Sequence, residues 1–499
     1  MDERRENQYD RAVPDTILRP LVEKYFSYGF GDKKILRSIT KEIDLESNRW
    51  TLSTKTIQRR RKDWGLLSVK QQHHTIATIA PFVEKFRIHS ANRLGVKSLR
   101  DHLREEKILV SRGILQQYQS LADPIGCRQR RAGQLTRAIY WSAGLHESWS
   151  FDQHNKWRRI GLWLHCGLEG FSNFVLWLKI WWTNSNPRLI ASFYFEAATR
   201  LGGIPMLTRS DPGTENHGIA NAQTTLRRQL DPSLQGTLQH KWMRGHSNIK
   251  PEIFWSKLRK QWSPGWEILF DKGLEQGWYD PKVAVELLLF RWLAIPMLQE
   301  DLNRFARIHN HSKPRRDNKK SMPAEIPNVL MEQPDEYGPF CDYKITVPAE
   351  MINQVATLFA PPEHEVFQLV PERFEKQAKT LFDELGHPAV DRESFWAIYL
   401  MMLEGFMSLP EAEAVALWED VHSNEAREET IQCEFMDVLP GLAVRGGPAM
   451  VGHAGKNYSS FPTARGAGED PSRAGSNDES LSEPGDEDDV PTVDMTPHV

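Results

Sequence analysis

The stretch Ser148–Trp182, SWSFDQHNKWRRIGLWLHCGLEGFSNFVLWLKIWW, decides how the middle of this 499-residue chain folds. It contains three strand-like runs, Ser148–Phe151, Ile160–Cys166 and Phe174–Trp182. The short segment EGFSN joins the second run to the third, and a connection of that length is typical of a β-hairpin. The sequence therefore predicts three antiparallel strands in succession.

Helices and strands alternate after these runs. Pro187 opens an amphipathic helix through Leu201, and Gly202-Gly203 ends it. A strand at Pro205–Thr208, a helix near Ile219–Leu230, a strand-like run at Thr237–Met243 and a helix from Pro251 follow. This order predicts a ribonuclease-H-like α/β core with a five-stranded mixed sheet and flanking helices.

Three acidic residues of this region stand where a carboxylate can be presented to a ligand. Asp152 follows the first strand-like run, Asp211 follows the fourth in LTRSDPGTEN, and Glu252 lies near the expected helix start in GHSNIKPEIFW. Each acid also has an ordinary structural explanation. Asp152 could simply end a strand, Asp211 could belong to an Asp-Pro-Gly turn, and Glu252 could be favoured by the helix dipole. Their joint occurrence in this order favours a shared site.

Such carboxylates suit phosphoryl transfer on DNA. The attacking oxygen, the leaving oxygen and the phosphate all carry negative charge, and two divalent ions about 3.5–4 Å apart can hold both oxygens. Mg²⁺ prefers hard oxygen ligands. We therefore interpret Asp152, Asp211 and Glu252 as catalytic and metal-binding residues for two Mg²⁺ or Mn²⁺ ions, with Asp152 bridging both.

The front of the chain is basic. Residues 1–140 hold 28 Lys and Arg against 16 Asp and Glu, a balance of +12, whereas the whole chain has a formal charge of -3. Residues 14–66 have the pattern of three short helices, and the third, Ser53–Trp64, begins at a capping serine. A basic helix of this kind fits the major groove and brings cations to phosphates. The expected contacts are Lys55, Arg59, Arg60, Arg61 and Lys62. A solvated basic face is the alternative.

A second group of cations surrounds Glu252. It comprises Arg244, Lys250, Lys257, Arg259 and Lys260. From a helix at that place they could contact backbone phosphates beside the scissile bond. An ordinary solvated amphipathic helix remains the alternative.

The chain is predicted to divide into six segments. These are a helix-turn-helix DNA-binding module (1–70), a second helical DNA-binding or linker module (71–140), the catalytic core (141–300), a basic linker (301–345), a helical C-terminal region (346–437) and a disordered acidic tail (438–499). The stretch DPIGCRQRR, with Arg128, Arg130 and Arg131, is expected to be a basic connector at the end of the second module.

Several classes of protein are excluded by composition. Four scattered cysteines without a CxxC pair argue against a disulfide framework and a structural zinc site. The longest apolar runs are too short to span a membrane, and the start MDERRENQYD has no apolar signal core. We expect an intracellular protein, in the nucleus if KPRRDNKK is an import signal rather than a DNA-facing loop.

The stretch from Trp149 to about Trp262 resembles the retroviral-integrase-like core of DDE transposases and integrases, especially those of mobile-element-derived genes of fungi and animals. The residues that carry the resemblance are WSFDQHNK, HCGLEGFSN, GGIPMLTRSDPGTEN and RGHSNIKPEIFW. The pieces LSTKTIQRRRKDWGL, DPIGCRQRR and FQLVPERFEKQAKTLF are similar to companions of that core in the fungal versions. The resemblance covers most of residues 15–400.

Three departures accompany the resemblance. Leu168-Glu169-Gly170 stands where relatives have Ile-Asp-Gly, and we expect an effect on packing or on the turn only. Lys250-Pro251 precedes Glu252 where relatives have Arg-Ile, and proline, which lacks an N–H and fixes φ, could change the aim of the acid. The His/Cys zinc module of retroviral integrases is missing from the sequence, so no structural zinc is expected.

The resemblance implies an integrase or transposase that binds double-stranded DNA, both element ends and target, and acts as a homo-oligomer. Water would first free a 3′-OH, and that hydroxyl would then attack target DNA. The alternative is a domesticated DNA-binding protein that keeps the core fold and no longer cuts. The intact set of three acids favours the enzyme, because a protein that does not cut has no chemical reason to retain them.

Overall fold

A five-stranded sheet forms the centre of the computed structural model, which describes residues 11–90, 93–131, 140–243, 247–315, 322–338, 341–440 and 443–444. The sheet has the order β10-β8-β4-β5-β6. Its strands are β4 (Ser148–His154), β5 (Trp163–Glu169), β6 (Val175–Trp181), β8 (Leu207–Ser210) and β10 (His240–Trp242). β4, β5 and β6 are antiparallel, whereas β8 runs parallel to β4 and to β10. The predicted fold class, a five-stranded mixed sheet with flanking helices, is confirmed.

The two faces of β4 serve different purposes because side chains alternate along a strand. Trp149 is fully buried on one face, with its ring 5.8 Å from that of Tyr194 on α9 (Pro187–Leu201). Asp152 and His154 point to the other face, where His154 lies 4.9 Å from the ring of Trp255 on α11 (Ile249–Gln261). The first face therefore belongs to the core, and the second carries the candidate chemistry.

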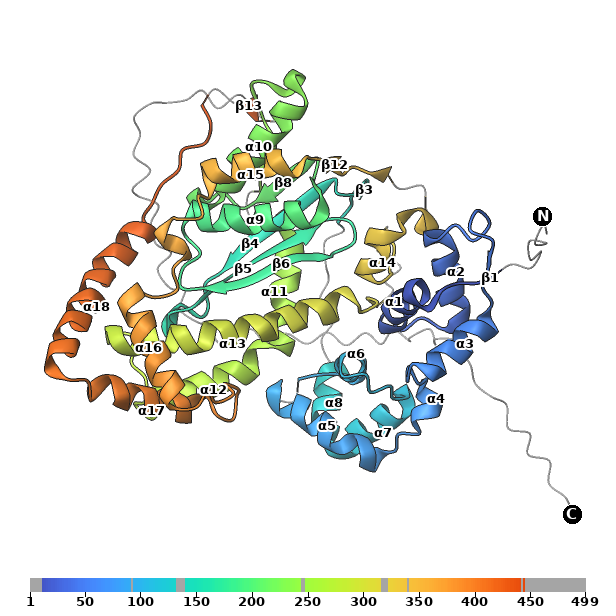
Figure 1. Cartoon of the computed structure of the whole chain (residues 1–499), viewed down its shortest axis with the longest axis horizontal. Coiled ribbons are helices and arrows are strands. Elements are labelled where there is room, and N and C mark those ends of the chain that lie inside the picture. Colours follow the sequence, from blue (N-terminus) through green and yellow to red (C-terminus); the bar gives the residue numbers. More distant parts are fainter. Residues whose placement is uncertain are drawn as a thin grey trace, which may run out of the picture. The chain divides into compact units, whose positions relative to one another are not determined.

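The outer edge of the sheet is protected by α13 (Ala284–Asn310), the long helix beside the sheet in Figure 1. Asn310 Oδ1 accepts from the backbone N–H of Val175 at 2.8 Å, and Gln299 Oε1 accepts from that of Ile180 at 3.0 Å. An edge strand with open N–H groups is a template for unwanted pairing. These side chains occupy part of that edge of β6.

Two helical groups precede the sheet, as predicted. The first consists of α1 (Asp15–Ser27), α2 (Asp32–Glu42) and α3 (Thr54–Asp63), and the second of α5 (Ile76–His89), α6 (Val96–Glu105), α7 (Arg112–Ala122) and α8 (Pro124–Arg131), with the short α4 (Val69–Gln72) between them. Each group has its own apolar core. Ser53 caps α3 by accepting a backbone N–H, as expected, and Ser111 caps α7 in the same way. Most of the stretch DPIGCRQRR, expected to be a basic connector, forms the helix α8.

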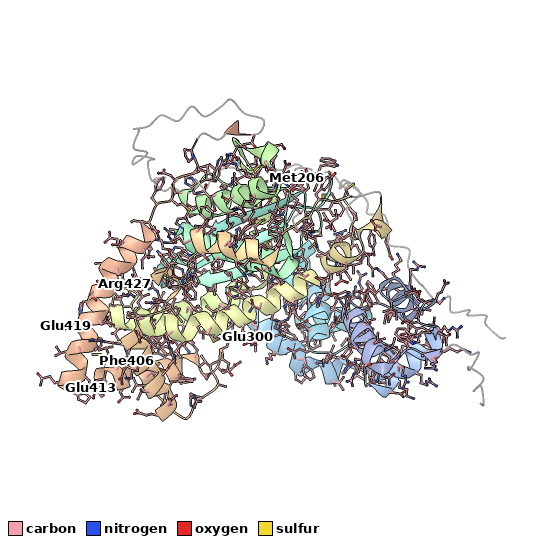
Figure 2. The ribbon with its side chains drawn as sticks, turned by 45° about the horizontal axis from the view of Figure 1, so that its top comes forward. Met206, Glu300, Phe406, Glu413, Glu419 and Arg427 are labelled. Carbon is pink, nitrogen blue, oxygen red and sulfur yellow. The ribbon has the colours of Figure 1, made fainter. Side chains whose placement is uncertain are left out.

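Five later helices share the core of the sheet, namely α12 (Ser263–Glu275), α15 (Ala349–Phe359), α16 (Glu372–Glu384), α17 (Phe395–Met407) and α18 (Glu411–Gln432). The short α14 (Pro327–Glu332) packs elsewhere, with Val329 in the core of the first helical group. Phe395 of α17, for example, packs 5.7 Å from Phe290 of α13. Figure 2 shows Glu413 and Glu419 on α18, and both side chains are exposed. The helix α13 also continues to Asn310, past the core boundary expected at residue 300.

The remaining strands pair in twos. β1 (Arg11–Ala12) pairs with β2 (Trp50–Thr51), β3 (Gly144–Leu145) with β11 (Cys341–Asp342), β7 (Gly203–Ile204) with β12 (Ile345–Thr346), and β9 (Thr237–Leu238) with β13 (Ala443–Val444). The acidic stretch of the predicted tail and most of KPRRDNKK lie outside the described residues. Within the described ranges, no helix has the length and apolar character needed to cross a membrane.

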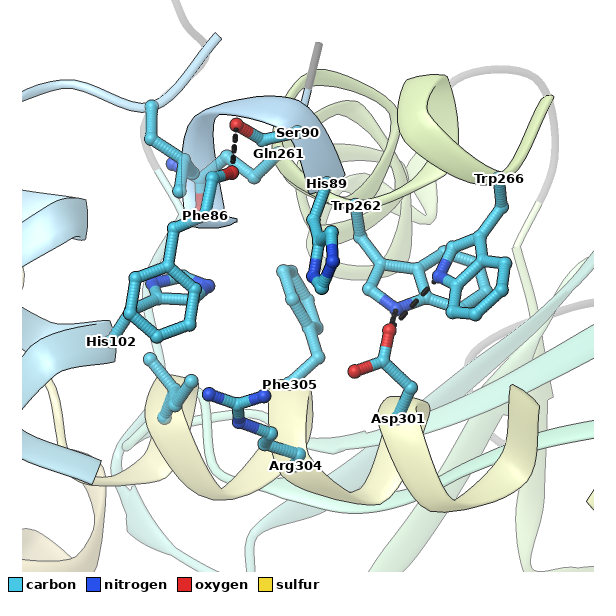
Figure 3. A pocket seen from close by; sticks show the side chains of 12 residues that line it. Phe86, His89, Ser90, His102, Gln261, Trp262, Trp266, Asp301, Arg304 and Phe305 are labelled. Atoms are coloured by element: carbon cyan, nitrogen blue, oxygen red, sulfur yellow. Dashed lines mark hydrogen bonds between the residues drawn. The ribbon is translucent and has the colours of Figure 1, made fainter. Parts of the chain in front are cut away.

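The second helical group meets the core helices at a polar seam. Arg304 and Arg307 of α13 pair with Glu106 at 2.5 Å and Glu105 at 3.0 Å. Beside these pairs is a cavity of about 40 Å³, into which Figure 3 shows side chains from α5, α6, α11 and α13 pointing. Asp301 accepts there from the indole N–H groups of Trp262 at 2.7 Å and Trp266 at 2.9 Å. A cavity of this volume holds a few water molecules.

Candidate active site

Asp152 and Asp211 lie beside each other near the ends of two neighbouring parallel strands, β4 and β8. The register of β4 and β8 pairs Ser148 with Leu207 and Ser150 with Arg209. Two further residues along each chain bring Asp152 level with Asp211, which directly follows β8. Neighbouring strands lie about 4.8 Å apart. The sheet thus sets two half-buried carboxylates side by side.

The electrostatics of Asp152 reflect this crowding. The pKa of Asp152 is raised to about 7, first by burial and then by the negative charges of Asp211 and, more weakly, Glu252. The Gln153 backbone N–H and the Trp255 indole N–H oppose the shift, because both donate to the charged carboxylate. A carboxylate whose pKa is raised by neighbouring acids in this way belongs to a donor set that a divalent cation would stabilise.

Glu252 lies in the first turn of α11, and its side chain is exposed. Pro251 is the third residue of the helix, where backbone N–H groups have no intrahelical acceptor in any case. The missing proline N–H therefore does not interrupt α11. Asn248 ties the helix start to the sheet, since its Nδ2 donates to the carbonyl of Phe151 at 2.9 Å. The helix is thus attached to the backbone one residue before Asp152.

The three acids do not form a closed cluster. Among the residues that the structure describes, no three His, Cys, Asp or Glu side chains converge closely enough to hold a metal ion. Asp152 and Asp211 form the inner pair, and Glu252 is the outer member at the same end of the sheet. Their oxygens are the hard ligands that Mg²⁺ and Mn²⁺ take, so the donor types fit.

The loop after Asp211 is held by Gln153 and Glu215, which the sequence did not single out, and by Asn216, for which a surface-loop role was expected but which is fully buried. Gln153 of β4 donates through Nε2 to Glu215 Oε1 at 2.7 Å and to Asn216 Oδ1 at 2.9 Å. Asn216 Nδ2 in turn donates to the carbonyl of Asp211 at 3.0 Å. A Cβ on Gly213 would lie 1.9 Å from Glu215 Oε1, so any larger residue there would displace the folded-back glutamate. These contacts fix the backbone that presents Asp211.

Glu169 stabilises the hairpin turn between β5 and β6, in keeping with the expected effect on the turn. Its fully buried carboxylate accepts from the backbone N–H groups of His146 and Phe171, both at 3.0 Å. The other oxygen accepts from the N–H and Oγ of Ser172 at 2.6 Å. The acid therefore organises the hairpin turn and belongs to the structure rather than to the candidate site.

The five cations expected on the recognition helix divide into two groups. Lys55, Arg59 and Lys62 are exposed on α3. Arg60 pairs with Asp15 at 3.1 Å. Arg61 is buried, pairs with Asp32 at 2.8 Å and lies over the ring of Phe26, which occupies its guanidinium inside the module. The open basic face of α3 therefore excludes Arg61.

The cations around Glu252 divide similarly. Lys250 is buried, donates to Asn173 Oδ1 at 2.6 Å and lies 4.2 Å from the centre of the Tyr140 ring. Lys257 Nζ donates to His309 Nδ1 at 2.9 Å. Arg259 is half-buried and Lys260 is exposed, whereas Arg244 lies outside the described residues. Only part of this group is placed to reach DNA.

Comparison with known families agrees with this geometry. Residues 139–333 match the family described as an integrase core domain. The chain therefore contains an integrase core domain, and proteins of this family bind DNA and generally use divalent metal ions. A comparison with curated proteins finds no match.

Proposed function

We propose that the protein is a DDE-type polynucleotidyl transferase that cleaves DNA and joins it to a target. The observation that carries the proposal is the parallel register that brings Asp152 level with Asp211 inside an integrase core domain. Glu252, attached through α11 to the strand that holds Asp152, is the third acid.

The proposed site works by supplying oxygen ligands at the end of the sheet. Two Mg²⁺ or Mn²⁺ ions, when bound, would neutralise charge on the attacking and leaving oxygens. Asp152, Asp211 and Glu252 would hold them. Water attacks a phosphodiester at the element end and releases a 3′-OH. That hydroxyl then attacks a phosphodiester of target DNA, so that each step forms one P–O bond and breaks another.

Double-stranded DNA is the proposed partner, held by two sets of side chains. The exposed cations Lys55, Arg59 and Lys62 of α3 suit contacts to backbone phosphates in the manner of a helix-turn-helix recognition helix. Arg259 and Lys260 of α11 lie on the helix that carries Glu252. The resemblance to multimeric integrases supports a homo-oligomer that acts in the nucleus on two element ends.

A strand-transfer assay with candidate element-end oligonucleotides and Mg²⁺ or Mn²⁺ tests this function. We expect Asp152→Asn and Asp211→Asn, which keep shape and lose charge, to reduce strand transfer to background. Their affinity for DNA should stay within about twofold of the unmodified protein, because phosphate contacts by cations supply most of the affinity. Glu419→Gln on the exposed face of α18 is the matched control. Full activity of either aspartate variant would refute the proposal.

A second candidate is a DNA-binding protein that keeps the integrase core and no longer cuts. The observation in its favour is that the described His, Cys, Asp and Glu side chains form no closed cluster of three. Titration with Mn²⁺ separates the two functions. If the protein is an enzyme, it should bind Mn²⁺, and Asp152→Asn should abolish that binding. If it is a non-catalytic DNA-binding protein, it should bind DNA without binding Mn²⁺ at this site.

A further inference from the structure

Trp255 makes a direct hydrogen bond to one of the candidate catalytic acids. Its indole Nε1 donates to Asp152 Oδ2 at 3.0 Å, and the side chain is 6% exposed. An indole N–H can only donate, so the bond has one possible direction. It joins α11, which carries Glu252, to β4, which carries Asp152.

The ring of Trp255 is itself held in place. His154 follows Asp152 by two residues and therefore faces the same side of β4, where its ring lies 4.9 Å from the indole. Phe254 packs at 5.8 Å. Contacts with neighbouring rings thus orient the indole whose N–H meets the carboxylate. An indole held in one orientation can in turn hold the Asp152 carboxylate in one orientation.

The bond leaves part of the Asp152 carboxylate available. An ionised carboxylate has about four acceptor positions; the indole uses one of them on Oδ2, and the Gln153 backbone N–H uses another. The remaining positions can still accept a ligand. Partners of this kind orient metal ligands, and their loss typically costs about 10–100-fold in metal affinity or activity.

We propose that Trp255 is a positioning residue that sets the orientation of Asp152 and its distance from Glu252. Trp255 follows Glu252 by three residues, so the two share a face of α11 and move together with the helix. The bond to Asp152 thereby fixes the inner acid against the element that carries the outer one. This inference rests on the proposed function, because it gives Asp152 a ligand to hold.

A purely structural role is the competing explanation, and the same helix offers a matched control. Trp262, at the end of α11, is equally buried and donates its indole N–H to Asp301 Oδ2 at 2.7 Å. Figure 3 shows this bond beside the cavity under α5 and α6. Trp262→Phe removes an indole-to-carboxylate bond of the same kind without touching Asp152.

The experiment measures Mn²⁺ affinity and thermal stability of the full chain for Trp255→Phe and Trp262→Phe. We expect Trp255→Phe to weaken Mn²⁺ binding about tenfold or more. Trp262→Phe should lose similar stability and change the affinity less than about twofold. Trp255→His, which restores a ring donor, should recover part of the affinity, and it serves in place of Trp255→Phe if that variant does not fold.

The outcomes separate this inference from the proposed function. Equal Mn²⁺ affinity for Trp255→Phe, Trp262→Phe and the unmodified protein, with binding still abolished by Asp152→Asn, overturns the positioning role alone. Failure of the unmodified protein to bind Mn²⁺ overturns the metal site and the positioning role together. Weakening by Trp255→Phe alone, with partial recovery by Trp255→His, supports the inference.

Discussion

Helices α3 and α11 both carry several cations but place them differently. On α3 the side chains of Lys55, Arg59 and Lys62 are exposed, whereas on α11 Lys250 is buried and Lys257 is held by His309. The two helices differ because more faces of α11 than of α3 are covered by other elements. α3 contributes one fully buried apolar residue, Ile57, to a small core. α11 packs against the sheet, α12 and α13, so fewer of its positions reach solvent.

The comparison shows that charge spacing alone does not identify a DNA-contacting helix. A long basic side chain can extend its charge to water only if a path to solvent exists. Asn173 and Tyr140 close that path for Lys250, and the half-buried Lys257 is directed to His309 and Phe305. The same rule removes Arg61 from the basic face of α3. Variants of individual cations can test each assignment.

The largest effect is expected for Arg61→Ala. Its guanidinium pairs with Asp32 inside the first helical group, and removal of one partner of a buried pair costs about 3 kcal/mol or more. In urea unfolding of the full chain, the first helical group of the variant should unfold at a lower urea concentration than in the unmodified protein. Arg59→Ala, two residues away and exposed, should change stability by less than about 0.5 kcal/mol. Equal stability of the two variants would contradict the assignment of Arg61 to the interior.

A smaller effect is expected when the open face of α3 loses its charge. Replacement of Lys55, Arg59 and Lys62 together by alanine should weaken DNA binding about 10–100-fold at moderate salt. The slope of log affinity against log salt should fall by about three, one for each phosphate-binding cation removed. Fluorescence anisotropy over a salt series measures both quantities.

The matched control for this variant lies on α16. Arg373, Lys376 and Lys379 form an exposed triplet on a helix outside the proposed DNA-binding face. Their replacement by alanine removes the same total charge. A loss of affinity as large as that of the α3 triplet would mean that general charge, rather than the face of α3, attracts DNA.

Local features of the fold could be predicted from the sequence because they depend on neighbouring residues. Pro187 and Gly202 bound α9 as expected, and Ser53 and Ser111 cap their helices. The helical structure of α8 was not specified by the sequence prediction of a basic connector, although its signal is local. Pro124 stands at its first position, and Asp123 Oδ1 accepts the Gly126 N–H at 2.9 Å. The run of basic residues that follows is equally typical of a connector, and it masks that helix start.

Other features depend on contacts between distant parts of the chain. The alignment of Asp152 with Asp211 follows from the register of β4 and β8, which no local pattern specifies. The enclosure of Lys257 depends on His309, in another helix. Trp255 was missed because a tryptophan on an apolar helix face is ordinarily a core residue, and its bond to Asp152 exists only once α11 meets β4.

The smallest effect on DNA binding is expected for Lys257→Met. Burial lowers the pKa of Lys257 from its ordinary 10.5 to about 8, so folding penalises the charged form. Below pH 8 the lysine is charged in both states and the full penalty applies. Between pH 8 and 10.5 the folded protein holds fewer protons than the unfolded chain, and stability rises with pH. Methionine removes this dependence.

Lys257→Met should therefore be at least as stable as the unmodified protein at pH 7, by about 1 kcal/mol, and should lose that advantage as the pH approaches 10.5. Its affinity for DNA should change less than about twofold. Chemical denaturation at pH 7, 9 and 10.5 measures the difference in unfolding free energy between the two proteins. Lys260→Met, exposed on the same helix, should show the pH dependence of the unmodified protein. The opposite result would be a difference in unfolding free energy between Lys257→Met and the unmodified protein that does not change with pH, together with a marked loss of DNA binding. Lys257 would then be a phosphate-binding residue, and α11 would present its cations to DNA as α3 does.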